Sequence, residues 1–506
     1  MASHPSSFGS LFGRLLKEHR TRRSFTLRRL AEAAACAEVT LRKIEAGARH
    51  PSTQMAHALA DALALDAVER DVFLCEARSH AARRPPIDLH ARLLAIAEDA
   101  TQRYPDEVQH AELDELEERF DEVSGVLLSL MRTSPHDAQR FAGALCEFWQ
   151  KRSRMTEGFH LLEQVLLLDL SPTEERARAL LAAGTVCACR DDFTRGRRYI
   201  DECLHIAETL RIDDLIARAV HVAAWLSLWD GESQHACIAR YEDAVRRFES
   251  LGDVHRSAHA RCDLAQAHIF GKIRRFDVAE HCVRTGLAQF LAVDSRSGTA
   301  FAHHTLTIIC AESGRYEEAE RFESEALATF RRIGGPRDIA WSLAHLGEVA
   351  QARGQLEQSA AYWEEALDSF LKLGERSGIG IALHSLARIA RENGQVELAQ
   401  RKIIAGLRLA SDWSRPFVFV HGLYELAGLR LAAAAPADAA LLIGAADALV
   451  ARHDMGEYFH AIRRFEEWRS STCAHLGEQD FTMLAQRGAS LSPDDALAAI
   501  QQQTAA

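Results

Sequence analysis

Three residues in the middle of the chain have the side chains and the spacing of metal ligands. His255, His259 and Cys262 are separated by four and three residues, so on a helix they share one face. Imidazole nitrogens and a thiolate are ligands that zinc and other borderline metals accept. Alternatively, the histidines lie on polar repeat faces and the cysteine fills a packing position. No group that would orient the histidines is evident, so we favour packing and predict no metal and no cofactor.

The other reactive side chains do not form a catalytic set either. Cys187 and Cys189 are two residues apart, and on a helix such side chains point to different sides. The sequence contains no Gly-x-x-x-x-Gly-Lys-Ser/Thr phosphate loop, no His-Glu-x-x-His pair and no Gly-x-Ser-x-Gly turn. We therefore predict that the protein is not an enzyme.

Charge is distributed unevenly along the chain. Residues 1–50 contain ten Lys and Arg against four Asp and Glu, a net charge of +6, whereas the whole chain carries −12 and the remainder therefore −18. A cationic segment attracts the phosphates of nucleic acid, and an anionic body is repelled by them. The composition predicts a nucleic-acid-binding N-terminal domain on a body that does not bind nucleic acid.

Residues 8–79 have the pattern of five short helices. The first carries an apolar stripe at helical spacing, formed by Phe8, Leu11, Phe12, Leu15 and Leu16. Thr26 is placed to cap the second helix, and Asp66 and Glu69 form a capping-box pair for the fifth. Gly47 is placed to end the third helix in the left-handed conformation.

The third of these helices has one apolar and one polar side. It is predicted to run from about Glu38 to Glu45, with Leu41 and Ile44 facing inward. Its outward residues are Glu38, Val39, Arg42 and Lys43.

This N-terminal segment resembles the xenobiotic-response-element family of helix-turn-helix regulators, which includes the phage repressors. The resembling residues are Phe25-Thr26, Leu30-Ala31, Ala34, Thr40-Leu41 and Ile44-Glu45, followed by Gly47 and Pro51-Ser52. In that family the third helix enters the major groove of DNA. The resemblance implies a double-stranded DNA operator, often palindromic, and therefore a homodimer.

Carried over by position, the resemblance assigns two groups of contacts. Glu38, Val39 and Lys43 would face bases, with the carboxylate accepting from cytosine, the valine touching a thymine methyl and the lysine donating to guanine. The phosphate contacts, which fix the register without reading sequence, would be Thr26, Arg28, Thr40, Arg42 and Arg49.

The body of the chain is periodic. Phe276, Tyr316, Leu356 and Val396 recur every 40 residues, and glycines precede the last three by two positions. Small residues follow three positions later, at Ala279, Ala319, Ser359 and Ala399. The rhythm extends back to Phe193 and Gln234 and forward to Pro436. Each unit is predicted to be a helix, a glycine turn and a second helix, and such units stack into a solenoid.

The units resemble tetratricopeptide repeats, although that family's repeat is usually ~34 residues. Longer units of this kind are similar to the sensor regions of large bacterial regulators. The predicted fold is all-α, with a five-helix helix-turn-helix domain followed by an α-solenoid of tetratricopeptide-like helix pairs. We expect a DNA-binding domain at 1–84, a helical linker at 85–174, repeats at 175–450 and a C-terminal helical cap at 451–506.

A solenoid of this kind offers a concave groove lined by the first helix of each pair. Cationic and aromatic residues on these helices are Arg337, Trp341, His345, Arg376, His384 and Arg388. Such groups could hold an anionic small molecule or a carboxylate; the alternative, which we favour for most of them, is that they are solvated or packed. The effector is otherwise open between a small molecule, a peptide and a protein.

The sequence also bears on location. Residues 1–10 are polar and no long apolar run follows them, so we expect neither a secretion signal nor a membrane span. The 11 cysteines are scattered without framework spacing, which is typical of the reducing cytoplasm.

Two functions remain open at this point. The first is a cytoplasmic transcription regulator that binds DNA through residues 8–79 and senses an effector or partner through its repeats. The second is a protein-interaction scaffold whose N-terminal domain docks protein and does not bind DNA.

Overall fold

The computed structural model describes most of the 506-residue chain. The described residues are 11–23, 25–34, 36–45, 51, 53–65, 69–70, 73–74, 87–102, 107–152, 154–190, 192–229, 233–270, 273–410, 416–452, 463–491 and 495. Every regular element in these ranges is a helix and none is a strand, which confirms the predicted all-α class. None of the helices searched in these ranges combines the length and the apolar character needed to cross a membrane.

The N-terminal domain is built on a small apolar core. Its described helices are α1 (Leu11–Arg22), α2 (Leu27–Ala33), α3 (Glu38–Glu45) and α4 (Thr53–Ala62). The residues at its centre are fully buried: Phe12, Leu16, Leu30, Leu41, Ile44, Leu59, Leu63 and Phe73. Most of the predicted fifth helix lies outside the described residues, as do Phe8, Gly47 and Arg49.

Six helices form the next segment. They are α6 (Ile87–Gln102), α7 (Glu107–Glu118), α8 (Phe120–Thr133), α9 (Pro135–Ala144), α10 (Cys146–Lys151) and α11 (Met155–Leu166). Phe141, Phe148 and Trp149 are almost fully buried among them. Gly158 lies so close to the Trp149 ring that a Cβ there would be 2.5 Å from it, so glycine lets α10 and α11 meet.

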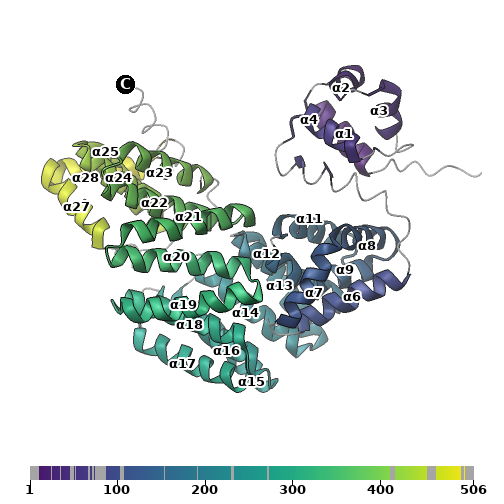
Figure 1. Cartoon of the computed structure of the whole chain (residues 1–506), viewed down its shortest axis with the longest axis horizontal. Helices are drawn as coiled ribbons and strands as arrows, with labels where there is room; N and C mark the ends of the chain where they lie inside the picture. Colours follow the sequence, from purple (N-terminus) through teal and green to yellow (C-terminus); the bar gives the residue numbers. More distant parts are fainter. Residues whose placement is uncertain are drawn as a thin grey trace, which may run out of the picture.

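The rest of the molecule is a stack of seven helix pairs in the described part of the chain (Figure 1). The first helices of the pairs are α12 (Glu174–Cys189), α14 (Asp213–Trp229), α16 (Val254–Ile269), α18 (Arg296–Glu312), α20 (Pro336–Ala352), α22 (Arg376–Glu392) and α24 (Pro416–Ala432). The second helices are α13 (Phe193–Leu210), α15 (Gln234–Ser250), α17 (Phe276–Ala292), α19 (Tyr316–Ile333), α21 (Leu356–Leu373), α23 (Val396–Ala410) and α25 (Pro436–Arg452). Two helices, α27 (Arg463–Leu476) and α28 (Glu478–Ala489), pack on the last pair.

The periodic residues of the sequence mark one place in every pair. Phe276, Tyr316, Leu356 and Val396 are each the first residue of a second helix. The glycines two positions earlier have positive φ, as at Gly354 with +76°, where an L side chain is strained. The period therefore reports the glycine turn between the two helices of a pair.

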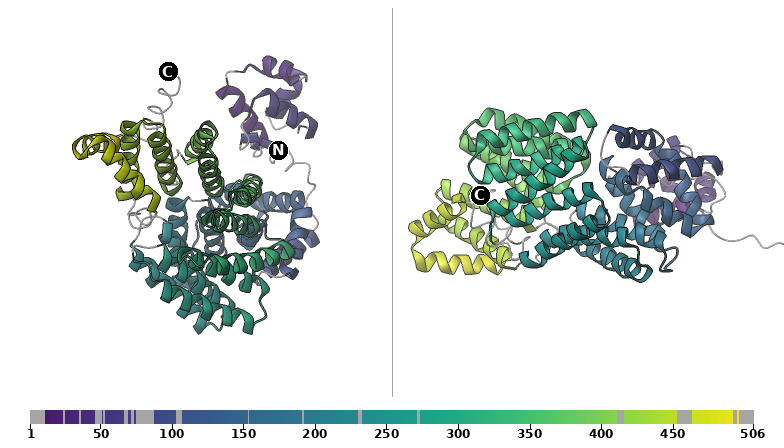
Figure 2. Two further views of the ribbon diagram at one scale, coloured as in Figure 1. Left: turned by 60° about the vertical axis from the view of Figure 1, so that its left-hand side comes forward. Right: turned by 90° about the horizontal axis from the view of Figure 1, so that it is seen from below.

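Small residues allow the two helices of a pair to approach. Ala279, Ala319, Ser359 and Ala399 are all fully buried. The Ser359 hydroxyl donates to the carbonyl of Gly347 at 2.7 Å, which satisfies its polar atom inside the pair. Large rings such as Phe290 and Phe370 fill the space between units. Successive pairs stack side by side into a curved array, whose curvature can be followed in Figure 2.

Candidate nucleic-acid interface and sensor groove

Helix α3 presents the outward face that a recognition helix needs. Val39 is 59% exposed, a large fraction for a valine, and Arg42 and Lys43 are exposed beside it. Glu38 and Thr40 are partly exposed. The structure thus brings the predicted base-facing residues onto one accessible surface, together with two of the predicted phosphate contacts.

The opposite side of α3 is fixed against the domain. Leu41 and Ile44 are fully buried, as the sequence predicts. Helix α1 crosses closely at Gly13, where a Cβ would lie 2.5 Å from the carbonyl oxygen of Ile44 and 2.8 Å from that of Glu45. A side chain at position 13 would push the two helices apart.

An ion pair that the sequence analysis missed ties α1 to the end of α3. The Arg20 guanidinium donates through Nε to Glu45 Oε1 at 2.5 Å and through Nη2 to Glu45 Oε2 at 3.0 Å. Its Nη1 also donates to the carbonyl of Phe25 at 2.9 Å, before α2. The two side chains are only 13% and 10% exposed, and the hydrogen bond to Glu45 raises the pKa of Arg20. We call this contact the Arg20–Glu45 clamp.

The remaining cationic residues of the domain are engaged to different degrees. Thr26 caps α2, its hydroxyl accepting from the Arg29 amide at 3.1 Å, as predicted. Arg28 pairs with Glu32 at 3.1 Å and Arg42 with Glu38 at 2.8 Å, but both arginines are highly exposed, so phosphate can compete for them. The predicted contact Arg49 lies outside the described residues.

Three of the predicted groove residues lie together in the array. Arg337 Nη2 and Trp341 Nε1 both donate to Glu375 Oε1, at 3.0 and 2.9 Å. Burial by itself would lower the pKa of Arg337, but the buried Glu375 carboxylate outweighs it and raises that pKa. His345 lies beside Trp341, with ring centroids 6.3 Å apart.

The other three do not form a common site. Arg376 donates to the Leu409 carbonyl at 2.9 Å, and Arg388 hydrogen-bonds the side chain of Gln351. His384 is fully buried, so its assignment to an open groove is wrong. Its ring occupies the space left by two glycines, since a Cβ on Gly406 or Gly422 would collide with it, and burial lowers its pKa to about 4.

The sequence-based metal set is not assembled. His255 is bound to Ser295 Oγ at 3.0 Å, and Cys262 is fully buried in a packing position. His259 instead shares Asp263 Oδ2 with His221, at 3.1 and 2.8 Å. The donor atoms of these three residues lie within 4.8 Å of one another and are the only such group among the described residues.

In the His221–Asp263–His259 group both imidazoles hold the carboxylate. Burial would raise the pKa of Asp263, but the two imidazoles outweigh burial and hold that pKa well below its usual range. His259 also stacks on Phe301, with ring centroids 4.2 Å apart. The carboxylate therefore joins α14 to α16 through its hydrogen bond to His221, and the stacking of His259 on Phe301 adds a contact with α18.

A comparison with known protein families identifies the N-terminal domain. Residues 11–73 match a family described as a helix-turn-helix domain, which confirms that prediction. No curated protein matches the chain.

Solved structures resemble the array at low identity. A Rap protein complexed with Competence and Sporulation Factor is 14% identical, with 73% of this chain and 99% of that chain covered and a TM-score of 0.42. The apo quorum sensor NprR from B. thuringiensis is 11% identical, with 75% and 99% covered and a TM-score of 0.42. A signal-transduction ATPase with a tetratricopeptide repeat sensor from Pyrococcus horikoshii is 11% identical, with 95% and 75% covered and a TM-score of 0.41. This chain is a helix-turn-helix domain followed by an array of stacked helix pairs.

Proposed function

We propose that this protein is a DNA-binding transcription regulator of the xenobiotic-response-element type. The observation that carries the proposal is α3, whose apolar side is buried and clamped while Val39 and Lys43 stand exposed on the other side. A recognition helix needs this combination, because base contacts require a helix that is held rigidly against its domain and whose outward side chains project toward the DNA.

The further parts of the proposal follow from the two-part architecture. The N-terminal domain, residues 1–84, binds a double-stranded operator as a homodimer, and the repeats at 175–450 sense an effector or bind a protein partner. A linker at 85–174 and a cap at 451–506 complete the chain. The protein acts in the cytoplasm and catalyses no reaction.

A binding-site selection with the full-length protein tests this function. We expect a duplex sequence to be enriched and the affinity for it to fall steeply with salt, since cationic side chains displace counterions from DNA. Replacing Arg42 and Lys43 together with alanine should abolish binding. Replacing Arg198, an exposed arginine on α13, should leave it unchanged.

If no sequence is enriched and the double variant behaves like the wild type, the proposal fails. The protein-interaction scaffold would then be the better description.

A further inference from the structure

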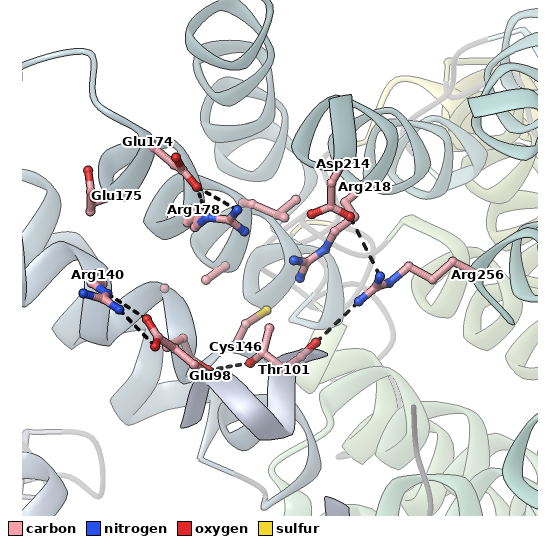
Figure 3. Close-up of a pocket in the computed structure, with 14 residues that line it drawn as sticks. Glu98, Thr101, Arg140, Cys146, Glu174, Glu175, Arg178, Asp214, Arg218 and Arg256 are labelled. Carbon is pink, nitrogen blue, oxygen red and sulfur yellow. Dashed lines mark hydrogen bonds and ion pairs between the residues drawn. The ribbon is translucent and has the colours of Figure 1, made fainter. Parts of the chain in front are cut away.

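A cavity lies between the helices that follow the N-terminal domain and the first helix pairs of the array. Its lining comes from α6, α9 and α10 on one side and from α12, α14 and α16 on the other (Figure 3). Its volume of about 530 Å³ is within the range of sites that hold small organic molecules, roughly 300–1,000 Å³. Neither the DNA-binding surface nor the groove residues described above belong to it.

The charged groups in this cavity are numerous and mostly paired. They are Glu98, Arg140, Glu174, Glu175, Arg178, Asp214, Arg218 and Arg256. Arg140 pairs with Glu98 at 2.7 Å and Arg178 with Glu174 at 2.8 Å. Glu175 lies 2.9 Å from His136.

Arg256 closes the cavity across the fold. Its guanidinium pairs with Asp253 at 2.7 Å and lies 3.9 Å from Asp214. It also reaches the carbonyl of Thr101, 155 residues away, at 3.4 Å. All four acidic residues of the lining are therefore taken up by cations other than Arg218.

Arg218 differs from the other arginines of the lining, which are paired with carboxylates. No described residue forms an ion pair or a hydrogen bond with it, and its guanidinium points into the cavity (Figure 3). Burial and the nearby Arg256 lower the pKa of Arg218 more than Asp214 and Glu147 raise it, yet a guanidinium remains charged at neutral pH. A buried cation that has no direct ion pair among the described residues is costly in the free protein, and a bound anion would offset that cost.

We propose that this cavity binds a small organic anion whose carboxylate or phosphate oxygens are held by Arg218. A guanidinium presents parallel N–H donors that match both kinds of oxyanion. Arg178 and Arg256 lie on the same lining and add positive potential, while Ala144, Leu181 and Ala182 offer an apolar wall for the body of the ligand. As the class of effector for the sensor array, this inference rests on the proposed function, but binding itself does not.

The test uses three probes with the same ring: phenyl phosphate, benzoate and the uncharged benzamide. Binding to the full-length protein is measured by calorimetry at 150 mM salt without DNA. We expect one anion to bind with a dissociation constant of about 1 mM or lower, and benzamide to bind about tenfold more weakly or not at all. The better anion identifies the acid group as phosphate or carboxylate.

Variants assign the binding to Arg218. Arg218→Met should weaken binding of the anion at least about tenfold, the loss of a charge-assisted hydrogen bond, and leave benzamide unchanged. Arg218→Lys keeps the charge and should bind at an intermediate level. Arg198→Met, on the exposed face of α13, should bind like the wild type. Circular dichroism of each variant confirms that it is folded.

Two results would overturn the inference: anions that bind no better than benzamide, or a folded Arg218→Met protein that binds them like the wild type. Failure here is distinguishable from failure of the proposed function. A protein that selects a DNA sequence but ignores the anions refutes only this site, and one that binds the anions but selects no DNA refutes only the regulator.

Discussion

The Arg20–Glu45 clamp makes a quantitative prediction about the recognition helix. Glu45→Gln keeps the size of the side chain and one acceptor oxygen but removes the charge that receives two hydrogen bonds, at 2.5 and 3.0 Å. The pair is about nine-tenths buried, so water compensates little for the change. Breaking a buried pair by removing one partner typically costs ~3–5 kcal/mol.

Because glutamine still accepts one neutral hydrogen bond, we expect a smaller loss, about 2–4 kcal/mol. That loss should appear as local opening of the N-terminal domain. Amide hydrogen exchange of peptides from residues 11–45 in the full-length protein should then speed up by about 30-fold to 1,000-fold. The affinity for the operator should also fall, since a mobile α3 no longer holds its outward side chains in one position for contact with the bases.

A matched control lies on the same helix. Glu38 also pairs with an arginine, Arg42, but the two side chains are 37% and 67% exposed. Glu38→Gln should change stability by less than about 0.5 kcal/mol, as exposed i,i+4 pairs do. The reasoning would be refuted if Glu45→Gln exchanged as slowly as the Glu38 variant.

Three other outcomes are expected. Burial lowers the pKa of His384 to about 4, whereas the histidine of the unfolded chain is protonated near pH 6.5. As pH falls below 6.5 the free energy of unfolding should therefore decrease, by about 2.5 kcal/mol between pH 7.5 and 4.5. A His384→Gln variant should lose less stability over that range, and an equal loss in both proteins would contradict this. Gly347→Ala should lower the melting temperature far more than Gly354→Ala, because a Cβ at 347 would lie 2.7 Å from Trp363, whereas at 354 only the positive φ is strained, ~1 kcal/mol; equal losses would refute the packing argument. Arg218→Met should raise the melting temperature without ligand, since it removes a desolvated charge that has no direct ion pair among the described residues; a lower melting temperature would show that Arg218 supports the fold.

The repeat architecture was accessible from the sequence because its signals are local. A glycine with positive φ and a small buried residue five positions later mark the turns at Gly314, Gly354 and Gly394, as Gly314 and Ala319 show. These constraints act within one unit and recur in successive units. Helix α3 of the N-terminal domain was equally predictable, since the spacing of Leu41 and Ile44 defines its buried side.

Contacts between distant parts of the chain were not predictable in the same way. Arg20 and Glu45 are 25 residues apart, and Arg256 and Thr101 are 155 apart, so neither pair follows from a helical period. Cys262 is fully buried against Gly286, in the packing role that the sequence analysis favoured for it. The hydrogen bond between His221 and Asp263, 42 residues away, does not follow from spacing either. His384 was misassigned because two glycines, at 406 and 422, leave room for its ring inside the core.

The claim that α3 reads DNA is tested most directly by repeating the binding-site selection with Val39→Ala. Val39 is 59% exposed and belongs to no buried cluster, so its truncation should change stability by less than about 0.5 kcal/mol. We predict that the variant still selects a sequence, with one position of the wild-type motif relaxed where the valine methyls meet a base. An identical motif from both proteins, or no motif from either, would contradict the account.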